Sequence, residues 1–220
     1  MRKWYLILLL TAMTLLAGSC KRRPLVELDN NVLLNITIDT SIVNYKVQAY
    51  PEMMRAIFFD SETGDFVSHS FLPHTGGYVH VMPGREYDIL VYNFDTEATI
   101  VEGDYNMNQI LAYTNLVPEN IKSRLKGRAG KGDDEMIVFE PDHLFVGMVH
   151  GVNIPVIYEE DEETEVIIEV DAHTVVETWR VSVTNVIGLE YVRDVVAIIS
   201  GQVESHFIGK DEKSEKSVSI

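Results

Sequence analysis

The sequence predicts an all-β protein built as two consecutive β-sandwiches. Short segments in which apolar and polar residues alternate recur along the chain, and Gly-, Pro- and Asp-containing turns separate them. No segment keeps a helical spacing of apolar residues beyond two or three turns. Val, Ile, Tyr and Phe are plentiful while Ala is sparse, which favours strands. We place the junction between the two sandwiches near residues 147–154.

The first sandwich is expected over residues 31–150. A half-buried strand is predicted for 32–39, where apolar residues occupy every second position. The segment 54–72 is typical of a β-hairpin with an acidic, Gly-containing turn. A short strand over 78–82 ends at a Pro-Gly turn. Because the next segment, 86–94, is apolar on both faces, we expect it to be a central strand.

The remainder of this domain is predicted to alternate between short strands and exposed loops. Residues 111–116 favour a strand, and 118–125 a short helix with a proline in its first turn. Residues 122–134 are Gly-rich and charged, so we expect an exposed loop there. Strand character returns over 135–140, and the pattern of 141–147 predicts a turn that ends the segment.

The second sandwich is expected over residues 151–220. Its predicted strands are 164–171, 174–185, 191–199 and 202–208, of which 174–185 has the longest alternation. The second sandwich is therefore expected to be shorter than the first and to be incomplete in its number of strands.

The N-terminus has the organisation of a secretory signal, predicted over residues 1–19. A basic start precedes an apolar run over 4–17, which is shorter than the roughly 20 residues of a membrane-spanning helix. Cys20, the single cysteine of the chain, follows directly and resembles the acylated cysteine of a bacterial lipobox. A lipobox usually has a leucine three residues before its cysteine; in this chain that leucine is displaced by one position, to Leu16. Either Cys20 is lipidated and begins a tether over 20–30, or ordinary signal peptidase cleaves near it.

Charge and cysteine content exclude several classes of protein. The chain has 18 basic and 34 acidic residues and a net charge of −16. Such acidity disfavours binding to nucleic acid and electrostatic adsorption to anionic lipid. A single cysteine cannot form an intrachain disulfide, so the stability of the fold must come from buried apolar area. We therefore expect membrane association through a lipid alone.

No motif in the chain indicates catalysis, a metal or a cofactor. His69, His74 and His80 do not have the spacing of a zinc site. The basic loop 122–131 lacks the Gly-Lys-Ser/Thr end of a phosphate-binding loop, and is predicted to be a solvated, protease-sensitive or partner-binding loop. The acidic run 159–163 lacks the spaced oxygen ligands of a calcium loop and is expected to be a linker or a strand edge.

Three segments carry a resemblance to a known family. Pro83-Gly84-Arg85-Glu86-Tyr87 with the strand that follows it, through Tyr92-Asn93, resembles a strand of the fimbrillin-like lipoproteins of the Bacteroidales. Residues 143–147 resemble the Leu-Phe-aromatic-Gly turn between their domains, with Val146 in place of the aromatic residue. Residues 179–201 match the opening strands of their second domain. The nearest groups are the minor-fimbria anchor proteins and a related domain family of unknown function.

The resemblance implies two tandem transthyretin-like (Greek-key) sandwiches on an outer-membrane lipid anchor, palmitoylated at Cys20. It also implies a role in cell adhesion, in which the protein anchors fimbriae or assists their assembly by β-strand addition with fimbrial subunits. The short second domain is either truncated or completed by a partner's strand. Because the residues after Cys20 are basic, either side of the outer membrane, periplasmic or external, stays possible for the protein. An alternative function is binding of a glycan or host ligand through the loops, since fold alone does not decide function.

Overall fold

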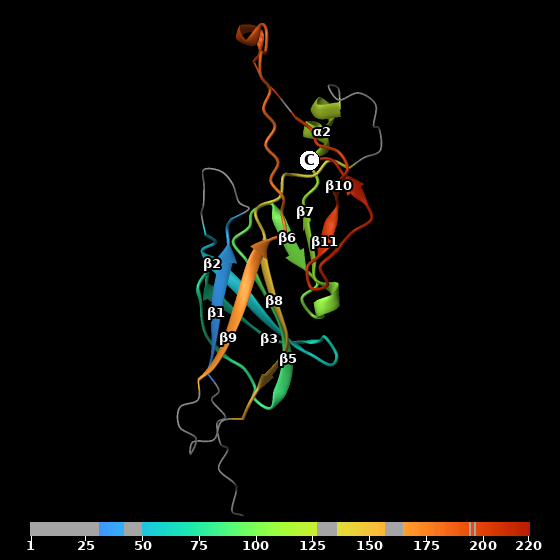
Figure 1. Ribbon diagram of the computed structural model, residues 1–220. Coiled ribbons are helices and arrows are strands. Elements are labelled where there is room, and N and C mark those ends of the chain that lie inside the picture. The colour runs from blue at the N-terminus through green and yellow to red at the C-terminus, as the bar shows by residue number, and fades with distance from the viewer. Residues whose placement is uncertain (1–30, 42–49, 127–135, 157–164, 194, 196) are drawn as a thin grey trace, which may run out of the picture.

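The computed structural model describes residues 31–41, 50–126, 136–156, 165–193, 195 and 197–220, and its ordered elements are nearly all strands (Figure 1). The predicted signal peptide, Cys20 and the tether lie outside these residues, as does the acidic run 159–163. Within the described ranges, no helix has both the length and the apolar character needed to cross a membrane.

A curved sheet of seven strands forms the body of the molecule. Its spatial order is β3-β2-β5-β8-β9-β1-β4. The strands are β1 (Asn31–Asp39), β2 (Met53–Asp60), β3 (Phe66–Pro73), β4 (Gly76–His80), β5 (Arg85–Asn93), β8 (Phe145–Ile154) and β9 (Val166–Thr174). Every neighbouring pair is antiparallel except β1 and β9, which run parallel. The sheet is nearly closed, because its two edge strands, β3 and β4, are joined by a tight turn and contact each other.

The inner face of this sheet encloses the main hydrophobic core. Alternate residues of the strands point inward, so that Leu34, Phe58, Tyr87 and Val170 are fully or almost fully buried in one cluster. The rings of Phe58 and Tyr87 meet edge to face with centroids 6.0 Å apart. The buried Tyr87 hydroxyl donates a hydrogen bond to the backbone oxygen of Met82 at 2.7 Å, which satisfies its polar group.

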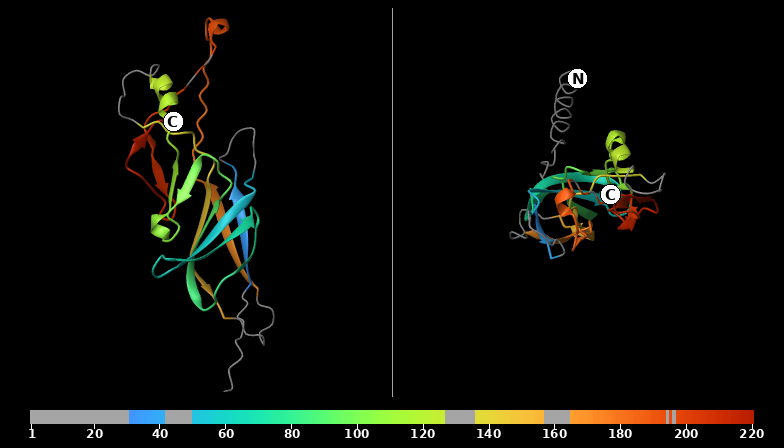
Figure 2. Two further views of the ribbon diagram at one scale, coloured as in Figure 1. Left: turned by 180° about the vertical axis from the view of Figure 1, so that it is seen from behind. Right: turned by 90° about the horizontal axis from the view of Figure 1, so that it is seen from above.

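A second, smaller layer covers part of the outer face (Figures 1 and 2). Its sheet has the order β12-β11-β7-β6. Its strands are β6 (Thr99–Glu102), β7 (Leu111–Thr114), β11 (Ser205–Phe207) and β12 (Glu212–Lys213), and a β10 (Gln202–Val203) and β13 (Ser217–Val218) pair lies nearby. Ile57, Leu90 and Tyr92 of the main sheet pack here against Ile110 and Ile208. Central strands with apolar residues on both faces therefore serve two cores.

Most predicted elements of the first domain are confirmed. The strand over 32–39 is β1, and the hairpin over 54–72 is formed by β2 and β3. The predicted central strand is β5, which lies between β2 and β8 and is buried on both faces. The predicted short helix is α2 (Glu119–Lys126). The all-β class is therefore confirmed.

The predicted turn over 141–147 and the boundary at 150/151 do not describe what the structure shows. Residues Phe145–Ile154 form one long strand, β8, and β9 completes the same sheet instead of opening a second one. Glycines at 147 and 151 suggested a turn, whereas Gly151 lies at a register shift within the β5–β8 ladder, with φ +65°. Two tandem sandwiches are thus not confirmed.

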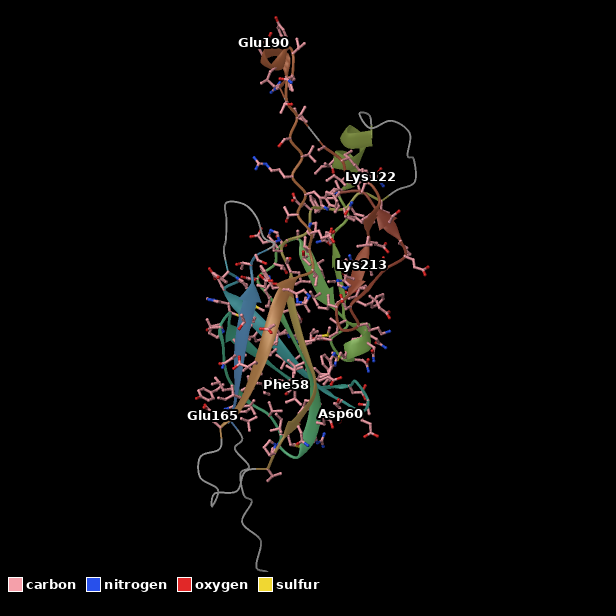
Figure 3. The ribbon with its side chains drawn as sticks, viewed as in Figure 1. Phe58, Asp60, Lys122, Glu165, Glu190 and Lys213 are labelled. Atoms are coloured by element: carbon pink, nitrogen blue, oxygen red, sulfur yellow. The ribbon has the colours of Figure 1, made fainter. Side chains whose placement is uncertain are left out.

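The strand predictions at 135–140, 174–185 and 191–199 are wrong in the described residues. Only isolated bridges form near 137–138, and β9 ends at Thr174. From there residues 177–193, which we call the arm, project away from the body and contain one 3-10 turn, Leu189–Tyr191 (Figures 1 and 3). A ladder needs a partner strand, and the described parts of the chain give the arm none.

Candidate interaction surfaces

Two of the family-like motifs meet at one buried asparagine. Asn93, at the end of β5, accepts a hydrogen bond from the backbone N–H of Phe145 at 2.7 Å. Its amide nitrogen donates to the backbone oxygen of His143 at 3.1 Å and to Asp95 at 3.2 Å. Asn93 is 4% exposed, so these bonds satisfy a buried polar side chain. The Tyr-Asn end of one motif therefore fixes the start of the other.

The glycine of the second motif is required by close packing between strands. A Cβ atom at Gly147 would lie 2.8 Å from the backbone oxygen of Asp171 and 2.8 Å from a side-chain carbon of Val170. Those atoms belong to β9, which contacts β8 at this point. This motif and the asparagine thus hold the main sheet together, and neither has a chemical role that the structure reveals.

A serine, an aspartate and a histidine come together at the β5–β8 register shift. Asp88 accepts hydrogen bonds from the Ser61 hydroxyl at 2.9 Å and from the Gly151 N–H at 2.9 Å, and His150 Nδ1 lies 3.2 Å from its other oxygen. Partial burial opposes ionisation of Asp88, but these partners outweigh it and hold its pKa below the ordinary value. The hydroxyl bonds to the carboxylate and not to the imidazole. The trio therefore lacks the serine–histidine contact of a nucleophile and its base.

The arm exposes a large apolar surface. Trp179, Val181 and Val183 alternate with Arg180 and Ser182, and the three apolar side chains are 70–75% exposed. Near the tip, where Figure 3 marks Glu190, Ile187 and Tyr191 are 99% and 87% exposed. Soluble proteins seldom leave so many large apolar side chains in water without an interaction to cover them.

A second exposed surface lies on the main sheet. We define the aromatic strip as Phe66, His69 and Phe71 of β3 together with Phe94, which follows β5. Successive ring centroids are 5.9, 5.4 and 5.1 Å apart, so the four rings form one continuous row. Phe71 and Phe94 are 47% and 51% exposed. Three of the four rings lie on β3, an edge strand that carries no Asp, Glu, Lys or Arg.

Arg55 lies beneath this strip on the neighbouring strand β2. Its guanidinium carbon is 5.9 Å from the ring centroid of Phe71 and 6.0 Å from that of Phe94. One amino group donates to the Tyr92 hydroxyl at 2.9 Å, and the other pairs with the Asp104 carboxylate. Burial disfavours the charge on Arg55, but these two partners outweigh burial and raise its pKa. For Tyr92, burial is the main cause that raises the pKa of the hydroxyl. The Tyr92 hydroxyl therefore stays protonated and can donate or accept a hydrogen bond.

The residues singled out from the sequence do not converge on one site. His69 lies in the aromatic strip, His74 stacks on Tyr50, and His80 ends β4. Within the described residues, no three His, Cys, Asp or Glu side chains are grouped to hold a metal. Lys122, at the start of the predicted basic loop, lies on α2 (labelled in Figure 3) and pairs with Glu119 at 3.6 Å. Residues 127–131 lie outside the described residues, as Cys20 does.

Local sequence does not indicate the aromatic strip. The pattern predicts the hairpin, but the face of the hairpin that is covered depends on the second layer, and that layer includes strands from near the C-terminus. Arg55 and Asp104 are also brought together from segments that are far apart in the chain.

Comparison with known proteins identifies relatives from Bacteroides. The chain is 29% identical over 206 residues to a Bacteroides ovatus protein named "Putative fimbrium anchoring subunit Fim4B". This match covers 93% of the chain and 55% of that protein, so the chain spans about half the length of its curated relative.

Two solved structures of B. ovatus proteins described as adhesins share the fold. The first has a TM-score of 0.56 and 24% identity, and the match covers 92% of this chain and 65% of the other. The second has a TM-score of 0.50 and 10% identity, with coverages of 87% and 62%. A family model matches residues 19–220. The chain therefore belongs to the family described as "Domain of unknown function (DUF5119)".

Proposed function

We propose that this chain is a non-catalytic, fimbrium-associated protein of the cell surface that holds a fimbrial subunit by β-strand pairing. The similarity to a protein named as a fimbrium anchoring subunit supports the fimbrial role. The observation that carries the mechanism is the arm. The arm projects from the body (Figure 1), apolar and polar side chains alternate over 179–183, and no strand in the described parts of the chain pairs with it.

Pairing with another strand would remove two costs at once. The backbone N–H and C=O groups of an extended segment gain ladder partners when a strand is added beside them. The row of Trp179, Val181 and Val183 gains an apolar surface to cover it. The competing occupant of the arm is a strand of the same polypeptide.

Binding of purified fimbrial shaft subunits to the full chain tests this proposal. Val181→Pro removes one backbone N–H from the arm, whereas Val181→Ala trims the side chain and keeps that N–H. If the arm forms a ladder with the subunit, the proline variant should bind at least about tenfold more weakly than the alanine variant. Equal affinities of the two variants, or no binding by the unaltered protein, would contradict strand pairing.

We further propose that a lipid on Cys20 attaches the protein to the outer membrane, where the predicted tether 20–30 leads to β1. Cys20→Ala should move the protein from the membrane to the soluble fraction and abolish labelling by a fatty-acid probe. Unchanged partitioning of this variant would support ordinary signal-peptide cleavage instead. This test does not depend on the arm, so the anchor and the partner contact can fail separately.

A further inference from the structure

The aromatic strip is a separate surface from the arm. The residues beside the strip indicate the chemistry of the ligand that it could bind. Acidic residues flank the exposed apolar side chains at both of its ends. At one end the Phe94 N–H donates to the Met53 oxygen at 3.1 Å, and the Glu52 N–H donates to the Asp95 carboxylate at 2.7 Å. This end therefore places Glu52 and Asp95 beside two exposed apolar side chains.

The opposite end has the same composition. The Phe66 N–H donates to the backbone oxygen of Tyr105 at 2.9 Å, and Tyr105 is 67% exposed. Asp65 and Asp104 are the chain neighbours of these two aromatic residues. Asp65 is held by Asn106 at 3.1 Å, and Asp104 by Arg55. A row of aromatic side chains is thus bordered by carboxylates at each end.

The strip is also ordered before any partner arrives. Arg55 touches the rings of Phe71 and Phe94 and is itself held by Tyr92 and Asp104. Side chains that are already fixed lose little conformational entropy on binding. Phe, Met, Tyr and Arg are the residue types enriched at the centres of protein–protein interfaces, and such centres carry most of the binding energy.

We propose that the aromatic strip binds a polypeptide segment in which Lys or Arg residues alternate with apolar side chains. The apolar side chains would contact Phe71 and Phe94, and the basic groups would face the carboxylates of Glu52 and Asp95. A net charge of −16 also steers basic partners toward this protein. This inference goes beyond the proposed fimbrial role, because it uses residues of β2, β3 and the adjoining loops and none of the arm.

Two other occupants fit the surface less well. A second copy of the chain carries the same large negative charge, so like-charge repulsion opposes its approach. A sugar ring would need an open aromatic face, whereas neighbouring rings of the strip are tilted by 45–76°. Arg55, beneath the strip, also lies 5.9 and 6.0 Å from the ring centroids of Phe71 and Phe94 and already contacts one side of this pair.

Fluorescence anisotropy with labelled peptides tests the proposal on the full chain. Three peptides of about eight residues, long enough to span β3, alternate Leu with Lys, Leu with Glu, or Ser with Lys. The Leu–Lys peptide should bind most tightly. The double substitution Phe71→Ser with Phe94→Ser should weaken this binding at least about tenfold. Ile167→Ser removes an equally exposed apolar side chain from β9 (51% exposed) and should leave it unchanged.

A second variant guards against misfolding of the first. Glu52→Gln changes one exposed rim carboxylate and should weaken the Leu–Lys peptide by about two- to fivefold, with a smaller salt dependence. The proposal is overturned if the Ser–Lys or Leu–Glu peptide binds as tightly as the Leu–Lys peptide. It is also overturned if the double Phe71/Phe94 variant and Glu52→Gln both bind the Leu–Lys peptide like the unaltered protein. It is equally overturned if an oligosaccharide, and no peptide, binds in a manner that the double substitution abolishes, or if sedimentation shows that the strip joins two copies.

Discussion

Strand β5 and the arm both carry several large apolar side chains, yet these side chains have opposite environments. In β5, five consecutive residues from Ile89 to Asn93 are buried, since β2 and β8 pair on either side and a core packs on each face. The arm leaves Val181 and Leu189 largely in water. An alternating sequence therefore indicates which side chains of a segment share a face. Whether that segment joins a ladder depends on whether another strand lies beside it.

Proline substitution gives the largest contrast between the two regions. Val91→Pro would remove a backbone donor in the centre of the sheet and clash with the pleated neighbours, at a cost of at least about 3 kcal/mol. Val181→Pro should leave the free energy of unfolding within about 0.5 kcal/mol of the unaltered protein, because the arm has no ladder to lose. Urea denaturation of both variants measures the difference. A large loss of stability from Val181→Pro would show that the arm is paired.

A matched leucine pair gives the next contrast. Leu90 is fully buried against the second layer, whereas Leu189 is 62% exposed at the tip of the arm. Leu90→Ala should lower the free energy of unfolding by about 2–5 kcal/mol. Leu189→Ala should change it by less than about 0.5 kcal/mol. Thermal melts of the two variants, compared at the same protein concentration, make the measurement; similar losses would mean that the arm packs in solution.

Removal of the buried amide at the end of β5 tests how the paired region is held together. Asn93→Ala would leave the Phe145 N–H without its partner and should destabilise the fold by about 1–3 kcal/mol. Asn108→Ala provides a control in an exposed 3-10 turn. We expect hydrogen exchange at the start of β8 to accelerate in the Asn93 variant alone. Protection that stays unchanged would assign the bond no role in that junction.

The smallest predicted effect concerns the Asp88 carboxylate. Its pKa is lower in the folded protein than in the unfolded chain, so its interactions stabilise the fold above the unfolded pKa of about 4 and are lost as the pH falls below that value. Asp88→Asn should therefore cost up to about 1 kcal/mol at pH 7. The gap to the unaltered protein should shrink on acidification. A gap that widens between pH 5 and pH 3 would reverse the assigned sign.

Alternation and turn residues predict β1, the β2–β3 hairpin and β5 correctly, because each is patterned over several consecutive residues. They fail at β8, where Gly147 is typical of a turn but instead permits close contact with β9. They also fail over 174–185, where the alternation is real but the ladder is absent. A glycine can mark either a turn or a close contact between strands. Alternation of apolar and polar residues does not show which strand, if any, pairs with a segment.

The surfaces were predicted less well than the strands. Nothing local indicates that Arg55 will meet Asp104, or that Phe94 will join the ring row begun on β3. Both contacts follow from the arrangement of strands that are distant in sequence. Cys20, by contrast, is predicted from its immediate neighbours alone, because targeting signals are linear segments, and its lipidation stays a prediction.

The parallel pairing of β1 with β9 has a mechanical consequence. Strand β1, the first strand of the body, follows the predicted tether in the sequence. Strand β9, the last strand of the main sheet, ends where the chain leads into the arm. Eight residue pairs, from Val32–Val166 to Asp39–His173, join these two strands. A pull between Cys20 and the arm would enter at the start of β1 and leave at the end of β9 (Figure 1). That geometry loads the ladder in shear, so all its hydrogen bonds must yield together and none can be peeled off singly. For a protein placed between a membrane and a filament, the order of its strands would itself resist tension.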